Sequence, residues 1–141
     1  MITAAPTAAA DPIVRTRHHL ASRRDAADRV LERAVHLAPA DRLLLEQVYR
    51  HGLSAAEVAR LTRQPTRTLQ RRVQRLLTHL ADPLFAYVAA RLELLPPETH
   101  PVAQYAILQG HSLRRTARLT GQSLHRVRQH LDTIRTLARH T

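Results

Sequence analysis

The chain has 141 residues and carries 22 basic side chains against 11 acidic ones, a formal charge of +11 at pH 7. Every base is an arginine, and the absence of cysteine excludes disulfides, zinc–thiolate sites and cysteine nucleophiles. Three glycines and the absence of Asn-Gly and Asp-Gly turns disfavour an all-β fold and favour an all-α one. With 3% aromatic residues, the core is expected to consist mainly of Leu, Val and Ala. So strong a positive charge favours nucleic acid as a partner. No uncharged stretch is long enough to span a membrane, so we expect a cytoplasmic protein without a membrane partner.

The first 36 residues are predicted to contain a tail and one helix. Residues 1–11 are rich in Ala, Thr and Pro, a composition typical of a disordered tail. Residues 12–36 follow as a helical segment, in which apolar side chains recur at helical spacing between Val30 and Val35.

The rest of the chain contains an internal repeat. A shift of 58 residues aligns 37–80 with 95–138 without a gap, and Ala-Arg-Leu-Thr at 59–62 recurs at 117–120. The further identical pairs include Leu37/Leu95, Pro39/Pro97, Gly52/Gly110, Ser54/Ser112, Gln64/Gln122 and Thr78/Thr136. This repeat predicts two similar units, 37–80 and 95–141.

The first unit begins with two predicted helices. One covers about 41–51, and Gly52 suits the left-handed residue that ends such a helix. Ser54 is the expected N-cap of a short helix over 55–61, with Glu57 at the capping-box position.

A third helix completes each unit, over about 66–80 in the first and 124–138 in the second. In the first unit it follows a turn containing Pro65. Its expected buried stripe consists of Leu69, Val73, Leu76 and Leu80. A short helix, a tight turn and a basic helix are typical of a helix-turn-helix, whose last helix enters the major groove of DNA.

A connecting helix is predicted within 81–94, with Asp82 as N-cap and Pro83 at its first position. We therefore expect an all-α fold, with an N-terminal helix, two tandem three-helix helix-turn-helix units and a connecting helix.

The first unit resembles region 4 of bacterial sigma factors of the sigma-70 family. The motif elements present are Leu37-Ala38-Pro39, Gly52-Leu53-Ser54, Glu57-Val58-Ala59, and Thr68-Leu69 followed by Arg72-Val73. Arg63 stands where the family has a turn glycine. The resemblance implies DNA binding by the third helix and docking on RNA polymerase.

The second unit is a more divergent version. It keeps Gly121 but has Thr116 at an apolar position and Arg115 where the glutamate belongs. Its Val127, His130-Leu131 and Ile134 pattern is similar to the recognition helix of LuxR-type activators. Because the 36 residues before the first unit contain no Trp, Tyr or Phe, we expect no promoter-melting region 2 and no complete sigma factor.

Arginine and glutamine on the third helices are the candidate DNA contacts, since a guanidinium pairs with guanine and an amide with adenine. The residues expected to contact bases are Arg67, Gln70, Arg71, Gln74, His125, Arg128 and Gln129. Those expected to contact phosphates are Ser54, Arg63, Thr66, Arg72, Arg75, Arg114, Arg115, Arg118 and Arg126. Asp132 makes the second face less basic, so packing or dimerisation is an alternative there.

Other chemistry has little support. The pairs His18–His19 and His125/His130 lack the spacing that places two metal ligands on one helical face. Phosphate-loop, zinc-protease and nucleophile-elbow motifs are absent, so we expect no enzyme, cofactor or metal.

Three functions remain open from the sequence. The first is a bacterial, nucleoid-associated transcriptional regulator that binds duplex DNA, as a pseudo-dimeric monomer or a homodimer. The second is a protein-interaction module that docks on RNA polymerase or a sigma partner without reading DNA. The third is an RNA-binding protein, although few aromatic residues are present to stack on bases.

Overall fold

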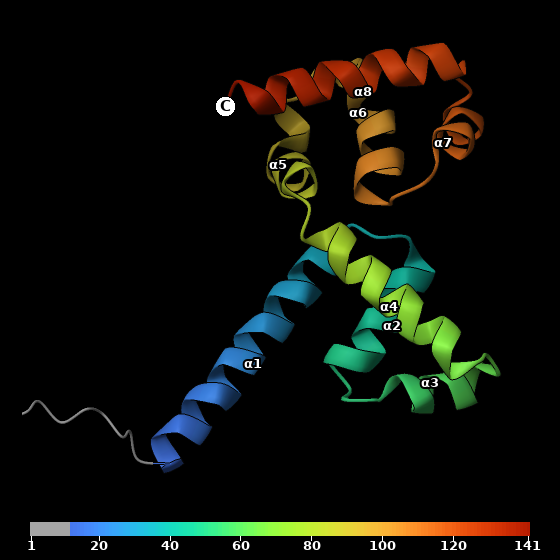
Figure 1. Cartoon of the computed structure of the whole chain (residues 1–141). Coiled ribbons are helices and arrows are strands. Elements are labelled where there is room, and N and C mark those ends of the chain that lie inside the picture. Colours follow the sequence, from blue (N-terminus) through green and yellow to red (C-terminus); the bar gives the residue numbers. More distant parts are fainter. Residues whose placement is uncertain (1–11) are drawn as a thin grey trace, which may run out of the picture.

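The computed structural model describes residues 12–141, with side chains from residue 21 onward (Figure 1). The predicted tail over residues 1–11 lies outside the described residues. Within the described part every regular element is helical, which confirms the all-α prediction there. In chain order the elements are α1 (Pro12–Ala34), α2 (Pro39–Tyr49), α3 (Ala55–Thr62), α4 (Thr66–Leu80), α5 (Pro83–Arg91), η1 (Leu92–Leu94), η2 (Pro97–Thr99), α6 (His100–Val102), η3 (Ala103–Leu108), α7 (Leu113–Thr120) and α8 (Leu124–Arg139).

Most helix ends that were predicted from capping residues, prolines and glycines lie within two residues of the observed ends. α2 begins at Pro39, earlier than predicted, because proline suits the first helical positions, where no N–H partner is needed. Pro65 is the N-cap of α4 and lies just outside the helix. Val35 was predicted to lie in the helical segment over 12–36, among its apolar side chains, and this was wrong. α1 ends at Ala34, and the Val35 side chain is 48% exposed.

The first half of the structure, α1–α4, is built around the C-terminal part of α1. This part packs against α2 and α4, while the N-terminal part extends away from the body (Figure 1). Of the predicted stripe of α4, Leu69, Leu76 and Leu80 are buried, whereas Val73 is only partly buried. Arg33 Nη1 donates to the Leu80 carbonyl oxygen at 2.8 Å, and so satisfies an acceptor at the end of α4.

The second half, α5–α8, repeats this packing. α5 takes the place of α1 and packs against η3 and α8. Even single hydrogen bonds recur with the 58-residue shift: His51 N donates to Glu46 O at 3.1 Å, and Gln109 N donates to Gln104 O at 2.9 Å. Gly52 and Gly110 both have positive φ angles, as the sequence predicted for Gly52.

The helix before α7 is less regular than its counterpart α2. It consists of η2, α6 and the π-type segment η3 in one continuous run. Pro101 supplies no N–H to this run, and the π geometry begins two residues after it.

The two halves share one hydrophobic core. Phe85 of α5 is fully buried, with its ring edge-on to His36, at 6.0 Å between centroids, and to His79, at 5.3 Å. His79 Nε2 donates to the Leu108 carbonyl oxygen at 3.0 Å, which bonds the end of α4 to the end of η3. The halves are therefore joined by packing as well as by the chain.

Candidate nucleic-acid interface

The turn between α3 and α4 is fixed by its backbone bonds. Ser54 caps α3 by accepting from the Glu57 amide at 3.1 Å, and its hydroxyl donates to the Glu57 carboxylate at 3.2 Å. The C-cap of α3 is Arg63, whose backbone is left-handed with a φ of 55°. The Gln64 amide then donates to the Ala59 carbonyl oxygen at 2.9 Å, and this bond closes the turn. This bond therefore keeps the turn between α3 and α4 short.

One face of α4 lies in the core and the opposite face in solvent. The residues of α4 that are predicted to contact bases are all exposed: Arg67, Gln70, Arg71 and Gln74. Among the described side chains, no carboxylate forms an ion pair with Arg67 or Arg71. Arg75 is also exposed and follows Arg71 by four residues, so the three arginines form a row along the helix. This face presents planar guanidinium donors and amides to solvent.

Arg72 differs from its neighbours because it bonds inside the protein. Its Nε and Nη2 both donate to Asp41 Oδ1, at 3.1 and 2.6 Å. The two side chains are 26% and 24% exposed, and the ion pair joins α4 to α2. The structure therefore gives Arg72, which was predicted to contact phosphate, a partner within the fold.

α7 and α8 repeat the arrangement of α3 and α4 with different side chains. Ser112 caps α7 and Ser123 caps α8, and Gly121 supplies the left-handed residue between the two helices. The face of α8 that was predicted to contact bases is exposed and consists of His125, Arg128 and Gln129, with Asp132 beside them. This face carries one arginine and one acid, so it is less positive than the face of α4.

The ion pair of the first half has no counterpart in the second. Thr99 and His130 stand at the positions of Asp41 and Arg72 in the repeat. Thr99 donates to the Pro96 carbonyl oxygen at 2.6 Å instead, and His130 Nδ1 is buried without a hydrogen-bond partner.

The remaining predicted phosphate contacts lie at helix starts, in the α3–α4 turn and along α4, α7 and α8. All of them are exposed: Ser54, Arg63, Thr66, Arg75, Arg114, Arg115, Arg118 and Arg126. The Ser54 hydroxyl is already engaged with Glu57. The arginines of this set form no ion pair among the described side chains.

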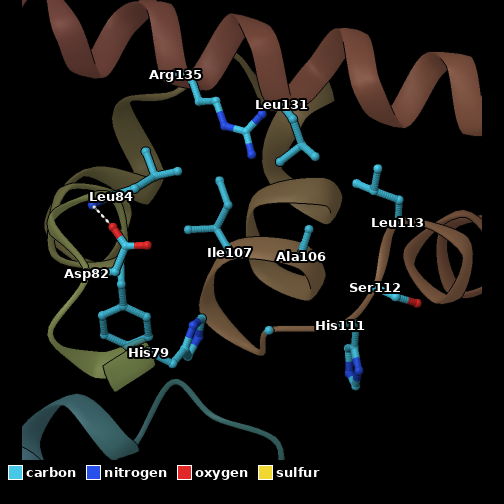
Figure 2. A pocket seen from close by; sticks show the side chains of 12 residues that line it. His79, Asp82, Leu84, Ala106, Ile107, His111, Ser112, Leu113, Leu131 and Arg135 are labelled. Carbon is cyan, nitrogen blue, oxygen red and sulfur yellow. Dashed lines mark hydrogen bonds between the residues drawn. The ribbon is translucent and has the colours of Figure 1, made fainter. Parts of the chain in front are cut away.

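The junction between the halves contains polar groups that the sequence analysis did not single out. Arg135 of α8 and His79 of α4 line one hollow there (Figure 2). The repeat alignment could have identified Arg135 as unusual, because an arginine stands there at the position of Leu77 in the first half. His111 lies at the same junction, and burial together with Arg115 lowers the pKa of its ring, while Asp41 acts in the opposite direction.

Metal ligands do not gather anywhere among the side chains described from residue 21 on: no three His, Asp or Glu residues lie close enough to hold an ion. Over the same stretch of chain, no helix is both long and apolar enough to cross a bilayer. His18 and His19 precede the residues whose side chains are described.

The faces of α4 and α8 both present exposed arginine and glutamine, and α7 adds the exposed Arg114, Arg115 and Arg118. Comparisons with protein-family models, with curated proteins and with solved structures found no match to this chain.

Proposed function

We propose that this protein binds duplex DNA and acts as a bacterial transcriptional regulator, with α3–α4 and α7–α8 as two helix-turn-helix units. In this proposal α4 and α8 are the recognition helices that enter the major groove. No enzymatic step is part of the proposed role.

The observation that carries the proposal is the exposed face of α4. Arg67 and Arg71 have no ion-pair partner among the described side chains, and Gln70 and Gln74 lie between and beside them. Guanidinium groups and amides are the side chains that pair in two-bond fashion with guanine and adenine. These donors are exposed to solvent, which supports a ligand rich in acceptors.

The flanking arginines support the same ligand. Arg63 and Arg75 on the first half, and Arg114, Arg118 and Arg126 on the second, are exposed cations on the two recognition helices or on the elements that adjoin them. Such cations fix the register of a helix on DNA by contacting phosphates.

Fluorescence anisotropy with a labelled random duplex tests the proposal. About six phosphate contacts predict a slope near −5 for log K against log salt concentration. A single-stranded DNA and a structured RNA of equal length serve as competitors, and we expect the duplex to bind most tightly. Weak binding at low salt, or a flat salt response, would count against the proposal.

A second candidate function is supported by two exposed leucines. Leu61 at the end of α3 is 69% exposed and Leu119 at the end of α7 is 44% exposed, at equivalent positions of the repeat. Exposed apolar side chains at repeated positions suit protein contacts, in agreement with a module that docks on RNA polymerase or a sigma partner. Leu61→Ser combined with Leu119→Ser should weaken such docking and leave DNA affinity unchanged. RNA is the weakest candidate, because Phe85 is buried and the three tyrosines are partly buried.

A further inference from the structure

A hollow between the two halves has no role in the proposed DNA contact. Its volume is about 340 Å³, and it is lined by His79 from the end of α4 and by Asp82, the N-cap of α5. Its opposite wall is α8, and its floor is formed by Ala106 and Ile107 of η3 (Figure 2). Both halves of the repeat therefore contribute to one cavity.

Apolar atoms make up slightly more than half of the surface that lines the hollow. Leu84, Ile107 and Leu131 point toward the centre of the hollow in Figure 2, and Leu113 closes its far side. An occupant therefore gains by covering these side chains with an apolar body.

One cation reaches over this floor. The Arg135 side chain extends from α8 into the hollow (Figure 2), and no carboxylate forms an ion pair with it among the described side chains. Asp82 lines the same hollow, but its Oδ1 accepts from the Leu84 amide at 2.9 Å. A guanidinium beside an apolar surface is suited to a carboxylate, which it binds with two parallel hydrogen bonds.

The surroundings select against other anions. An inorganic phosphate or a DNA phosphodiester would leave the apolar side chains of Leu84, Ile107 and Leu131 uncovered. The negative charge of Asp82 also repels a dianion more strongly than a singly charged acid. A singly charged acid with an apolar body satisfies the cation and covers the floor.

We propose that this hollow binds a small carboxylic acid with an apolar body. Its carboxylate pairs with Arg135, and its body lies on Leu84, Ile107 and Leu131. The volume of about 340 Å³ is near the lower end of ligand pockets, which suits an acid of one ring or a short alkyl chain.

The site has a consequence for α4 and α8. Because the hollow is walled by both halves, an acid bound there fixes the end of α4 against α8. This consequence rests on the proposed DNA binding, whereas the site itself does not.

Phenylacetate is the first probe, and phenylacetamide is its uncharged control. In ¹H–¹³C spectra of the full-length protein without DNA, we expect phenylacetate to shift the methyl signals of Ala106, Ile107 and Leu131. The amide should bind at least about tenfold more weakly, since it lacks the charge-assisted bonds to Arg135. Equal binding of the acid and the amide, or shifts confined to other methyl groups, would overturn the proposal.

Three variants locate the site. Arg135→Gln should weaken phenylacetate binding by about tenfold and abolish the preference for acid over amide. Arg139→Gln, one turn further along α8 and outside this hollow, is the matched control and should bind as the unmodified protein does. Ala106→Leu fills the hollow without changing charge and should block both probes. The proposal is wrong if Arg135→Gln, with an unchanged melting temperature, binds phenylacetate normally.

DNA binding is measured in a separate arm. Anisotropy with a duplex, with and without saturating phenylacetate, reports whether the acid alters DNA affinity in the unmodified protein and not in Arg135→Gln. If the methyl shifts appear but the protein binds no duplex, the acid site stands and the proposed DNA function fails. If duplex binds but the methyl shifts do not appear, the acid site fails and the DNA function stands.

Discussion

Arg63 and Gly121 adopt the same left-handed backbone conformation at the ends of α3 and α7, with φ angles of 55° and 69°. The same closing bond follows each of them, from Gln64 N to Ala59 O at 2.9 Å and from Gln122 N to Ala117 O at 3.1 Å. Glycine adopts this conformation without cost, whereas a residue with a Cβ atom is strained there. The turn after α3 therefore has the same geometry as the turn after α7, but it is built with Arg63, a residue that disfavours the left-handed conformation.

Arg63→Gly should therefore stabilise the protein, by about 1 kcal/mol. Arg63→Ala is the matched control, because it removes the same charge but keeps a Cβ atom. Urea unfolding followed by circular dichroism measures both. Equal stabilities of the two variants would show that the left-handed backbone at this position carries no strain.

Thr116 and Val58 occupy equivalent buried positions in α7 and α3, at 0% and 1% exposure. The Thr116 hydroxyl oxygen has no hydrogen-bond partner, and a buried unsatisfied hydroxyl is costly. Thr116→Val, which keeps the shape of the side chain, should raise the free energy of unfolding by about 1–2 kcal/mol. The reverse change, Val58→Thr, should lower it by a similar amount. A destabilised Thr116→Val would indicate that its hydroxyl does have a partner in solution.

Local sequence signals predicted the helices and their exposed faces, but not the contacts between the two halves. Ser54, Gly52 and Asp82 predicted helix ends because caps and left-handed residues act within a few positions of the chain. The exposed face of α4 likewise followed from its period of apolar residues. The predicted short helix over 55–61 agrees closely with α3, which covers Ala55–Thr62.

Contacts between distant segments could not be predicted in this way. The Arg72–Asp41 pair spans 31 positions, and the bond from His79 to Leu108 spans 29. Both depend on how complete helices pack, and neither residue type nor periodicity specifies that packing. The hollow beside Arg135 went unpredicted for the same reason, since its walls come from both halves.

The Arg72–Asp41 pair predicts different roles for two arginines of α4. Arg72→Gln should lower the free energy of unfolding by about 1–2 kcal/mol, because it leaves a half-buried carboxylate without its partner. Arg75→Gln is its control on the same helix: its side chain is exposed and has no ion pair among the described side chains, so stability should hardly change. For duplex DNA the order should reverse, with the larger loss of affinity in Arg75→Gln. A loss of DNA affinity at Arg72 without a loss of stability would mean that Arg72 leaves Asp41 to contact phosphate.

His111 should make stability depend on pH. Burial and Arg115 lower its pKa below the usual 6.5, so the unfolded chain binds a proton more readily than the folded protein does. The contribution of His111 to stability is therefore fully present above pH 6.5 and is lost as the pH falls through the lowered pKa. We expect His111→Gln to gain stability relative to the unmodified protein as the pH falls from about 7.5 to about 5.5. Urea midpoints give this difference, and an NMR titration of the His111 ring gives the pKa. A ring pKa above 6.5 would reverse the expected sign.

The two faces proposed to read DNA should contribute unequally to specificity. In the face of α8, Gln129 and Asp132 stand at the positions of Arg71 and Gln74, so one fixed positive charge is lost and one acid is gained. Each well-formed two-bond contact to a base contributes about 1–3 kcal/mol of discrimination. Arg71→Ala should therefore relax sequence preference and cost affinity in that range.

Arg128→Ala is the matched change on the second face and should lower affinity for all duplexes alike, because Asp132 beside it weakens the approach of the helix to the phosphates. The comparison uses a site selected from random duplexes and competition with a scrambled duplex of equal length and composition. If Arg128→Ala abolishes the preference while Arg71→Ala retains it, the second half is the reader and the first supplies general affinity. If both variants keep the full preference, neither arginine contacts a base, and α4 and α8 do not lie in the groove as proposed.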